Sequence, residues 1–171
     1  MIEEYNGVII RQFDPEMDSI SELTSLLNHC YKSLADMGFQ YLTARQDESI
    51  TLNRIKGAYC LIGVKDDKIV ASISYYPSER AKGCAWYEKE GVGKFGQFGV
   101  EPGLQRNGLG SKLIDIVENY ARENGAKEIA LDTAEGATHL IESYKKRGYR
   151  FIEYANWDVT NYRSVIMSKK L

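Results

Sequence analysis

The sequence predicts a single α/β domain, in which a mixed and mostly antiparallel sheet of about six to seven strands is flanked by about four helices. Apolar residues recur at helical spacing in some segments, and short β-branched runs of strand length fill others. The chain of 171 residues suits one hydrophobic core. No linker, repeat or low-complexity tract divides it, so residues 1–171 are expected to fold as one domain.

The first part of the chain predicts a strand followed by two helices. The run GVIIRQF, Gly7 to Phe13, is typical of a short strand and is closed by Asp14-Pro15. From about Asp18 an apolar face repeats at helical spacing and stops near Gly38. A shorter helix is expected over Glu48 to Ile55.

The middle of the chain predicts a hairpin and a third strand. Two apolar, β-branched runs, Ala58 to Val64 and Ile69 to Tyr76, are joined by a polar turn, which is typical of a β-hairpin. A polar loop, Pro77 to Gly93, leads into a strand over about Lys94 to Val100.

The last part predicts alternating helices and strands. An amphipathic helix begins near Leu109 and ends at Gly125, which stands where a left-handed stop is favoured. A short strand then precedes a helix for which Asp132 or Thr133 is the expected N-cap. The expected segments are the strand Glu128 to Leu131, the helix Glu135 to Arg147 ended by Gly148, and the closing strands Tyr149 to Trp157 and Tyr162 to Ser168.

Charge and cysteine content exclude several classes of protein. The formal net charge is −2, and Lys and Arg are scattered, so no nucleic-acid partner is expected. Cys30, Cys60 and Cys84 show neither a disulfide pattern nor ligand spacing, so no metal is expected and a reducing, cytoplasmic location fits. No apolar leader and no apolar run of about 18 residues is present, which predicts an unprocessed chain with no membrane partner.

Two glycine patterns fail as nucleotide-binding motifs. The run GVGKFG, Gly91 to Gly96, has dinucleotide spacing but leads into a strand, whereas that fingerprint must open a helix. Gly103 and Gly108 have the spacing of a P-loop, but Leu109-Gly110 stands where Lys-Ser/Thr is required. ATP and GTP chemistry is therefore disfavoured.

A third pattern, QRNGLG from Gln105 to Gly110, lies between a strand and an amphipathic helix. Gly108 and Gly110 lack a Cβ, so a ligand can approach the backbone. The unpaired amides of the first helical turn and the helix dipole favour an anion there, and Arg106 could add a contact to a phosphate. A glycine-rich helix start that binds nothing is the alternative from these residues alone.

Two motifs together resemble the GNAT superfamily of acyl-CoA N-acyltransferases. They are QRNGLG, after a strand, and YKKRGY from Tyr144 to Tyr149, about forty residues later. The resemblance is clear from about Phe95 to Phe151 and agrees with the element order over the whole chain. It implies a GNAT-like fold, acetyl-CoA as the acyl-donor cosubstrate, and transfer to an amine.

The resemblance implies a binding site for acetyl-CoA. The pyrophosphate would lie on the turn, and the pantetheine arm would pair with the preceding strand through backbone hydrogen bonds. Gly99 would permit a bulge or a close approach there, although an ordinary strand glycine is the alternative. The expected binding residues are Phe98, Gly99, Val100, Gln105, Arg106, Asn107, Gly108, Leu109, Gly110 and Ser111.

Tyr144 matches the family tyrosine that protonates the leaving thiolate, and it is the expected catalytic residue. A phenol stays protonated at neutral pH and can donate to a sulfur anion. The alternative is a core stripe with Leu140 and Ile141. Many relatives carry an asparagine early in this helix, where Ala137 and Thr138 stand here, so that contact is lost or made differently.

The general base has no clear candidate, because the strand Lys94 to Val100 carries no acid. Glu88, Glu90 and Asp132 are near the expected cleft in the chain, but each also suits a solvated charge or a helix cap. The nearest cysteine in sequence, Cys84, has no neighbouring histidine to activate it, so direct attack by the amine within a ternary complex is expected.

The acceptor is expected to be the primary amine of a small molecule. Aromatic and acidic residues near the expected groove could receive a small cationic amine: Tyr41, Glu79, Trp86, Tyr87, Glu88, Glu90, Trp157 and Tyr162. One alternative is a protein N-terminal or lysine acetyltransferase, and another is a non-catalytic CoA-binding regulatory module. A homodimer through the aromatic C-terminal hairpin is a further expectation.

Overall fold

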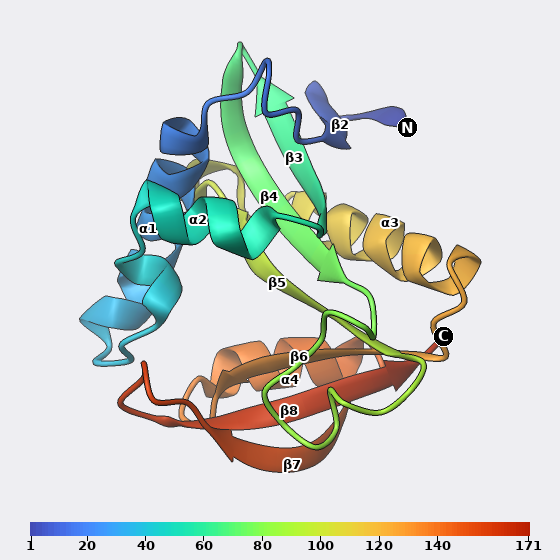
Figure 1. The fold of residues 1–171 in the computed structure, drawn as a ribbon. Helices are drawn as coiled ribbons and strands as arrows, with labels where there is room; N and C mark the ends of the chain where they lie inside the picture. Colours follow the sequence, from blue (N-terminus) through green and yellow to red (C-terminus); the bar gives the residue numbers. More distant parts are fainter.

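The computed structural model describes residues 1–171 and contains one eight-stranded sheet in the order β1-β2-β3-β4-β5-β6-β8-β7 (Figure 1). The strands are β1 (Ile2–Tyr5), β2 (Val8–Gln12), β3 (Tyr59–Lys65), β4 (Lys68–Tyr76), β5 (Val92–Val100), β6 (Glu128–Ala134), β7 (Arg150–Asn156) and β8 (Arg163–Lys170). The helices are α1 (Ile20–Asp36), α2 (Glu48–Ile55), α3 (Leu109–Glu123) and α4 (Thr138–Lys146), with 3-10 turns η1 (Leu42–Ala44) and η2 (Pro102–Leu104). The expected α/β class is confirmed.

The sheet opens between β5 and β6. These two strands are parallel and pair only where Val92 to Lys94 meet Glu128 to Ala130, whereas all other neighbouring strands are antiparallel. Beyond Lys94, β5 continues beside β4 and β6 continues beside β8. The divergence leaves the edge of β5 from Phe95 to Val100 without a strand partner on that side (Figure 1).

The helices cover both faces of the sheet. Alternate residues of β3 face opposite sides: Leu61 belongs to the core under α3, and Ile62 to the core under α1 and α2. Within α3, Leu113 and Val117 are completely buried, and each such side chain contributes about 1.5–3 kcal/mol. The covering helices therefore fix β5 firmly where it leaves β6.

Two expectations about the elements are confirmed closely. The helix over Glu48–Ile55 has the expected bounds. The hairpin between β3 and β4 turns at Asp66 and Asp67, whose φ angles of 50° and 58° are those that a two-residue hairpin turn requires.

Three other expectations need correction. The sheet has eight strands because Ile2–Tyr5 pairs with β2. The residues of this first strand alternate between exposed and half-buried, and two of them are acidic, so their pattern did not predict a strand. Asp132 and Thr133 cap no helix, because both continue β6 and pair with Ile166 and Val165 of β8. Helix α4 begins later than expected, after Ala137, and no side chain caps it.

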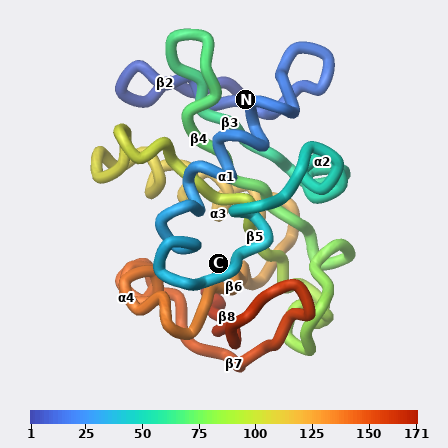
Figure 2. Tube along the Cα trace, turned by 90° about the vertical axis from the view of Figure 1, so that its left-hand side faces the viewer, coloured from blue at the N-terminus to red at the C-terminus, as the bar shows by residue number.

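The C-terminal hairpin closes over the segment that follows α1 (Figure 2). Asn161 accepts a hydrogen bond from the Gln40 amide at 2.9 Å and donates to the Gly38 carbonyl at 2.9 Å. On β7, the outer strand, Phe151 and Tyr154 are about half exposed. Dimerisation through this hairpin stays a prediction. None of the helices has the length and apolarity that a bilayer crossing needs.

Candidate active site

The turn before α3 presents unpaired backbone donors. Arg106 and Gly108 adopt left-handed φ angles of 66° and 87°, which turn the chain sharply into the helix. No acceptor in the protein receives the N–H groups of Arg106, Asn107, Gly108, Gly110 and Ser111. Unpaired amides and the positive end of a helix dipole are features that favour an anion.

The side chains around this turn fix its shape. Asn107 Oδ1 accepts from the Leu109 amide at 3.2 Å, so that amide is occupied and Leu109 contributes a buried side chain instead. Gln105 Nε2 donates to the Val100 carbonyl at 3.1 Å. Tyr5 of β1 donates to the Asn107 carbonyl at 3.1 Å, and a Cβ on Gly108 would collide with its hydroxyl. The N-terminal strand therefore supports the turn, which the sequence did not indicate.

A cavity of about 340 Å³ continues from the turn along the free edge of β5. Of the expected binding residues, Phe98, Gly99, Val100, Gln105, Arg106 and Gly110 line it, whereas Asn107, Gly108 and Ser111 are exposed on the turn outside. The cavity also receives side chains from α1, β6 and α4. This lining, which joins unpaired amides of the turn to the free edge of β5, suits a ligand with an anionic end.

Gly99 permits a close approach, one of the two roles expected for it, and the bulge lies just before it in β5. The register of β4 and β5 shifts between Ser74–Gly96 and Ser72–Gly99, and Gln97 adopts the left-handed φ of 48° at that shift. A Cβ on Gly99 would lie 2.8 Å from Cys30 Cβ, so only glycine lets α1 approach β5 here.

Tyr144 lies in the same cavity and its hydroxyl has no hydrogen-bond partner in the protein. Its ring makes edge contacts with Phe95 and Tyr149, at centroid distances of 6.2 and 5.9 Å. Burial, with smaller effects of Tyr41 and Asp132, raises the pKa of Tyr144 above its ordinary value. The phenol is therefore a protonated donor that faces the cavity with a free hydroxyl.

Cys30 is the cysteine at this cavity, which sequence distance had not indicated. Burial, with a smaller effect of the Glu101 carboxylate, raises the pKa of its thiol to about 12. At neutral pH the thiol is protonated and is a weak nucleophile. The structure therefore offers no activated cysteine beside Tyr144.

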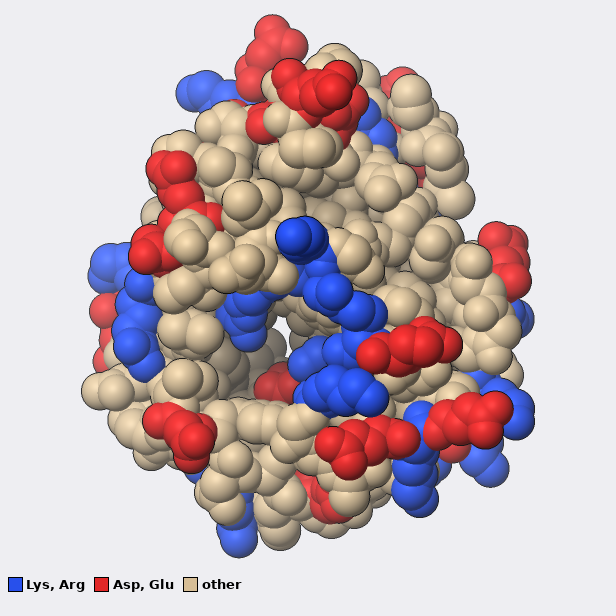
Figure 3. All heavy atoms as spheres, in the orientation of Figure 1, with Lys and Arg blue, Asp and Glu red and all other residues tan.

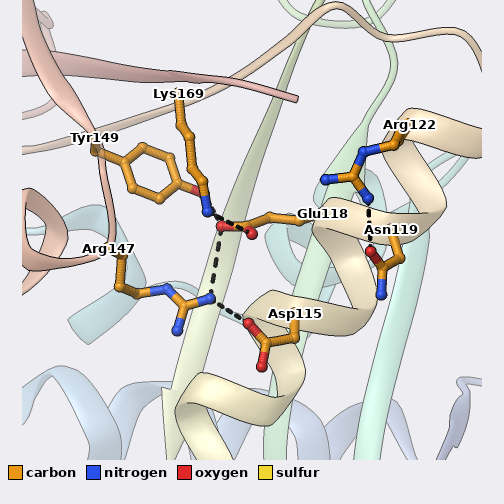
Figure 4. A network of polar contacts seen from close by, with 7 residues as sticks. All are labelled: Asp115, Glu118, Asn119, Arg122, Arg147, Tyr149 and Lys169. Carbon is orange, nitrogen blue, oxygen red and sulfur yellow. Dashed lines mark hydrogen bonds and ion pairs between the residues drawn. The ribbon is translucent and has the colours of Figure 1, made fainter.

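Charged and polar side chains anchor the segment that follows Tyr144 to α3 (Figure 4). Glu118, which is buried, accepts hydrogen bonds from Tyr149 at 2.9 Å and from Lys169 at 2.8 Å. Arg147 Nη2 lies 2.5 Å from Asp115 and 3.6 Å from Glu118. These contacts hold the segment after α4, the helix that carries Tyr144, against α3.

We expect Glu118→Ala to lower the free energy of unfolding by about 3 kcal/mol, because it leaves two polar partners unpaired beside the core. Urea denaturation measures the loss. Glu123→Ala is the matched control, since Glu123 is an exposed carboxylate of the same helix. Equal losses in the two variants would show that the contacts in Figure 4 carry no special stability.

A second cavity, of about 490 Å³, meets the first at Tyr31, Tyr41 and Asp132, which line both. Four cationic side chains and one carboxylate line it: Arg54, Arg80, Lys82, Lys94 and Asp132. Figure 3 shows Lys and Arg atoms gathered around the central hollow of the molecule. The structure thus joins a groove with unpaired amides at one end to a cationic chamber.

The expected acceptor residues divide between this chamber and other places. Tyr41, Trp157 and Tyr162 line it, as expected. Trp86, Tyr87 and the acids Glu79, Glu88 and Glu90 are not among its lining residues. Tyr87 is buried and donates to Asp132 Oδ1 at 2.6 Å. The three loop acids therefore do not supply the expected acidic lining for a cationic amine.

Comparisons with known proteins show which family and which relatives this chain resembles. A family model described as the acetyltransferase (GNAT) family matches residues 20–149. The S-(2-succino)cysteine N-acetyltransferase of Bacillus subtilis (strain 168) is 27% identical over 131 residues, which are 75% of this chain and 76% of that protein.

Solved structures show the same fold. An acetyltransferase from Streptococcus agalactiae 2603 aligns with a TM-score of 0.73 at 21% identity, over 98% of this chain and 100% of that chain. A GNAT family acetyltransferase from Elizabethkingia anophelis with acetyl-CoA bound aligns with a TM-score of 0.65 at 12% identity, over 98% of this chain and 100% of that chain.

Proposed function

Because this chain belongs to the acetyltransferase (GNAT) family, we propose that it moves an acetyl group from acetyl-CoA to the primary amine of a small molecule. The amine attacks directly within a ternary complex. The observation that carries the proposal is the meeting of two cavities at Asp132, one lined by Tyr144 and the turn, the other open to an acceptor.

Two features of the groove support acetyl-CoA as its ligand. The unpaired amides of Arg106, Gly108 and Gly110 would hold the pyrophosphate, and the free edge of β5 would pair with the pantetheine arm. Acetyl-CoA supplies a thioester, an acyl group already activated for transfer. The N–H groups on that edge of β5 would stabilise the negative charge on the thioester oxygen during attack.

Tyr144 supplies the proton for the sulfur. As the amine nitrogen forms its bond to the acetyl carbon, the carbon–sulfur bond breaks and sulfur keeps the bonding pair. The free Tyr144 hydroxyl donates a proton to that sulfur, and solvent restores the phenol. An ammonium and acetyl-CoA therefore yield an amide, the CoA thiol and one proton released to solvent.

Asp132 is the proposed base. Its carboxylate lines both cavities, and Tyr87 occupies Oδ1, which leaves Oδ2 without a partner. A carboxylate at this junction attracts the ammonium form of the acceptor and removes the proton that must leave before attack. Glu88 and Glu90, the other acids considered from the sequence, line neither cavity.

We expect Asp132→Asn to lower kcat by about a hundredfold at neutral pH, the usual contribution of a general base. The amide keeps an oxygen for the Tyr87 hydroxyl, so acetyl-CoA affinity stays unchanged. Steady-state rates and calorimetric titration with acetyl-CoA measure the two effects. Glu88→Gln is the control, and a similar loss in both variants would remove Asp132 from the mechanism.

The curated relative supports a small-molecule acceptor, since its name gives S-(2-succino)cysteine as the substrate of that protein. The proposal is tested by CoA thiol release from acetyl-CoA in the presence of amino acids, polyamines and peptides, with the acetylated product identified by mass. Release that needs a free amino acid supports it. Release with peptides alone indicates a protein acetyltransferase, and acetyl-CoA binding without release indicates a non-catalytic module.

A further inference from the structure

The chamber that meets the acetyl-CoA groove is strongly cationic. On the basis of the function proposed above, we infer that the acceptor bound in this chamber is an amine that also carries carboxylates. Arg54, Arg80 and Lys82 bind those carboxylates. The four cations of the chamber face only one carboxylate, Asp132, although the whole chain has a formal net charge of −2. This local excess of positive charge is therefore a property of the chamber.

Three of the cations have no acid of their own. No carboxylate oxygen lies within 4.0 Å of Arg54, Arg80 or Lys82, whereas Arg11 and Arg163 each have one. The fourth, Lys94, lies 3.9 Å from Asp132 and 4.6 Å from the centre of the Tyr87 ring. Neighbouring cations without counter-ions repel one another, so an anionic ligand would relieve this repulsion.

Hydrogen bonds hold the Arg54 guanidinium in an orientation suited to binding a carboxylate. Its Nη1 donates to Thr43 Oγ1 at 3.1 Å and to Gln46 Oε1 at 2.9 Å. Gln46 is itself buried and donates to Gln97 at 2.9 Å, the residue of the β5 bulge. The remaining N–H groups of Arg54 have no partner in the protein. A guanidinium fixed at one nitrogen, with other donors free, is arranged to receive a carboxylate.

Arg80 is held in a similar way on the opposite segment. Its Nη2 donates to the Lys56 carbonyl, and its guanidinium lies over Gly57, where an added Cβ would be 3.0 Å from Nη1. Lys82 follows closely in the chain and forms no hydrogen bond or ion pair. The chamber thus offers oriented donors from α2 and from the loop after β4.

The charges also orient the acceptor. Asp132 at the junction attracts the ammonium group, and the arginines attract the carboxylates away from the junction. An amino acid with additional acidic groups satisfies both ends. A polyamine places a second positive charge among four cations, so the chamber disfavours it.

The test compares amines of one backbone that differ in carboxylates: norvaline, glutamate and γ-carboxyglutamate, with putrescine as the cationic comparison. We expect kcat/KM to rise on the order of tenfold with each added carboxylate, as expected for one charge-assisted hydrogen bond. Putrescine is expected to be the poorest acceptor. Equal or faster transfer to putrescine overturns the inference.

Two variants test whether the cations of the chamber cause the preference for amines that carry carboxylates. Arg54→Gln and Lys82→Gln should each raise the KM for γ-carboxyglutamate roughly tenfold or more and leave the affinity for acetyl-CoA unchanged. Lys82→Gln breaks no hydrogen bond, so it separates recognition from folding. Arg122→Gln, on the exposed side of α3, is the control. A KM that is unchanged in both chamber variants contradicts the inference.

Calorimetric titration of γ-carboxyglutamate into the CoA-loaded protein measures binding of the amine independently of catalysis. If no amine is acetylated but binding is weakened by Arg54→Gln, the anion subsite stands and the proposed function fails. If amines are acetylated but γ-carboxyglutamate binds no better than norvaline, the subsite fails and the function stands.

Discussion

We expect Tyr144→Phe to lower kcat roughly tenfold or more, since a general acid contributes at least this much. The substitution removes only a hydroxyl that makes no hydrogen bond within the protein, and the phenyl ring keeps its edge contacts with Phe95 and Tyr149. Affinity for acetyl-CoA should therefore stay within a factor of two or so, because no binding contact is lost. Steady-state rates and calorimetry with acetyl-CoA measure the two quantities.

The pH profile gives an independent reading of the same residue. Because burial raises the pKa of Tyr144, the proton is retained through neutral and mildly alkaline pH. The wild-type rate should not fall through loss of this proton up to about pH 10, the ordinary pKa of a phenol.

Tyr154→Phe, on the exposed outer strand, is the control for the Tyr144→Phe substitution. An unchanged kcat in Tyr144→Phe would remove Tyr144 from the mechanism.

The second large effect concerns the turn, where we expect Gly110→Asp to abolish measurable CoA binding. A Cβ on Gly110 would lie 3.3 Å from Phe98 Cζ, at the floor of the groove, and the new carboxylate would compete with the pyrophosphate for the same amides. An acidic residue in the first helical turn is favourable for the helix, so the variant should fold. Calorimetry with CoA measures the loss.

Gly103→Asp is the matched control. It adds the same charge seven residues earlier, on η2, at a position where a Cβ meets nothing within 4 Å. Gly108→Asp is also expected to abolish CoA binding, but it is a less clean test, since Gly108 has a left-handed φ of 87° and an added Cβ collides with Tyr5. Retained CoA binding in Gly110→Asp would overturn the pyrophosphate assignment.

Local pattern was sufficient to predict most of the fold. The face of α1, the hairpin turn at Asp66-Asp67 and the glycine that ends α3 each depend on nearby residues. The strand Ile2–Tyr5 could not be predicted this way, because its residues gain stability only by pairing with β2. The prediction that Asp132 or Thr133 caps a helix was wrong for the same reason, because pairing with β8 outweighs their preference for a cap position.

The candidate site likewise contains residues that local motifs predict and residues that only the fold brings together. The turn QRNGLG and Tyr144 are local motifs, and the structure brings Gln105, Gly110 and Tyr144 to one cavity. Cys30 reaches that cavity only through the close approach of α1 to Gly99. The cationic chamber collects side chains from α2, the loop after β4 and β5, and no spacing along the chain connects them. The proposed acceptor site was therefore outside the reach of motif analysis.

We propose that the acetyl group passes in one step from acetyl-CoA to an amine that enters through the cationic chamber. The most direct test is the initial rate of CoA thiol release with acetyl-CoA and γ-carboxyglutamate both varied. We predict release that depends on the amine and double-reciprocal lines that intersect, as a ternary complex requires. Parallel lines, which indicate an acetylated enzyme, or release that is independent of the amine would contradict the claim.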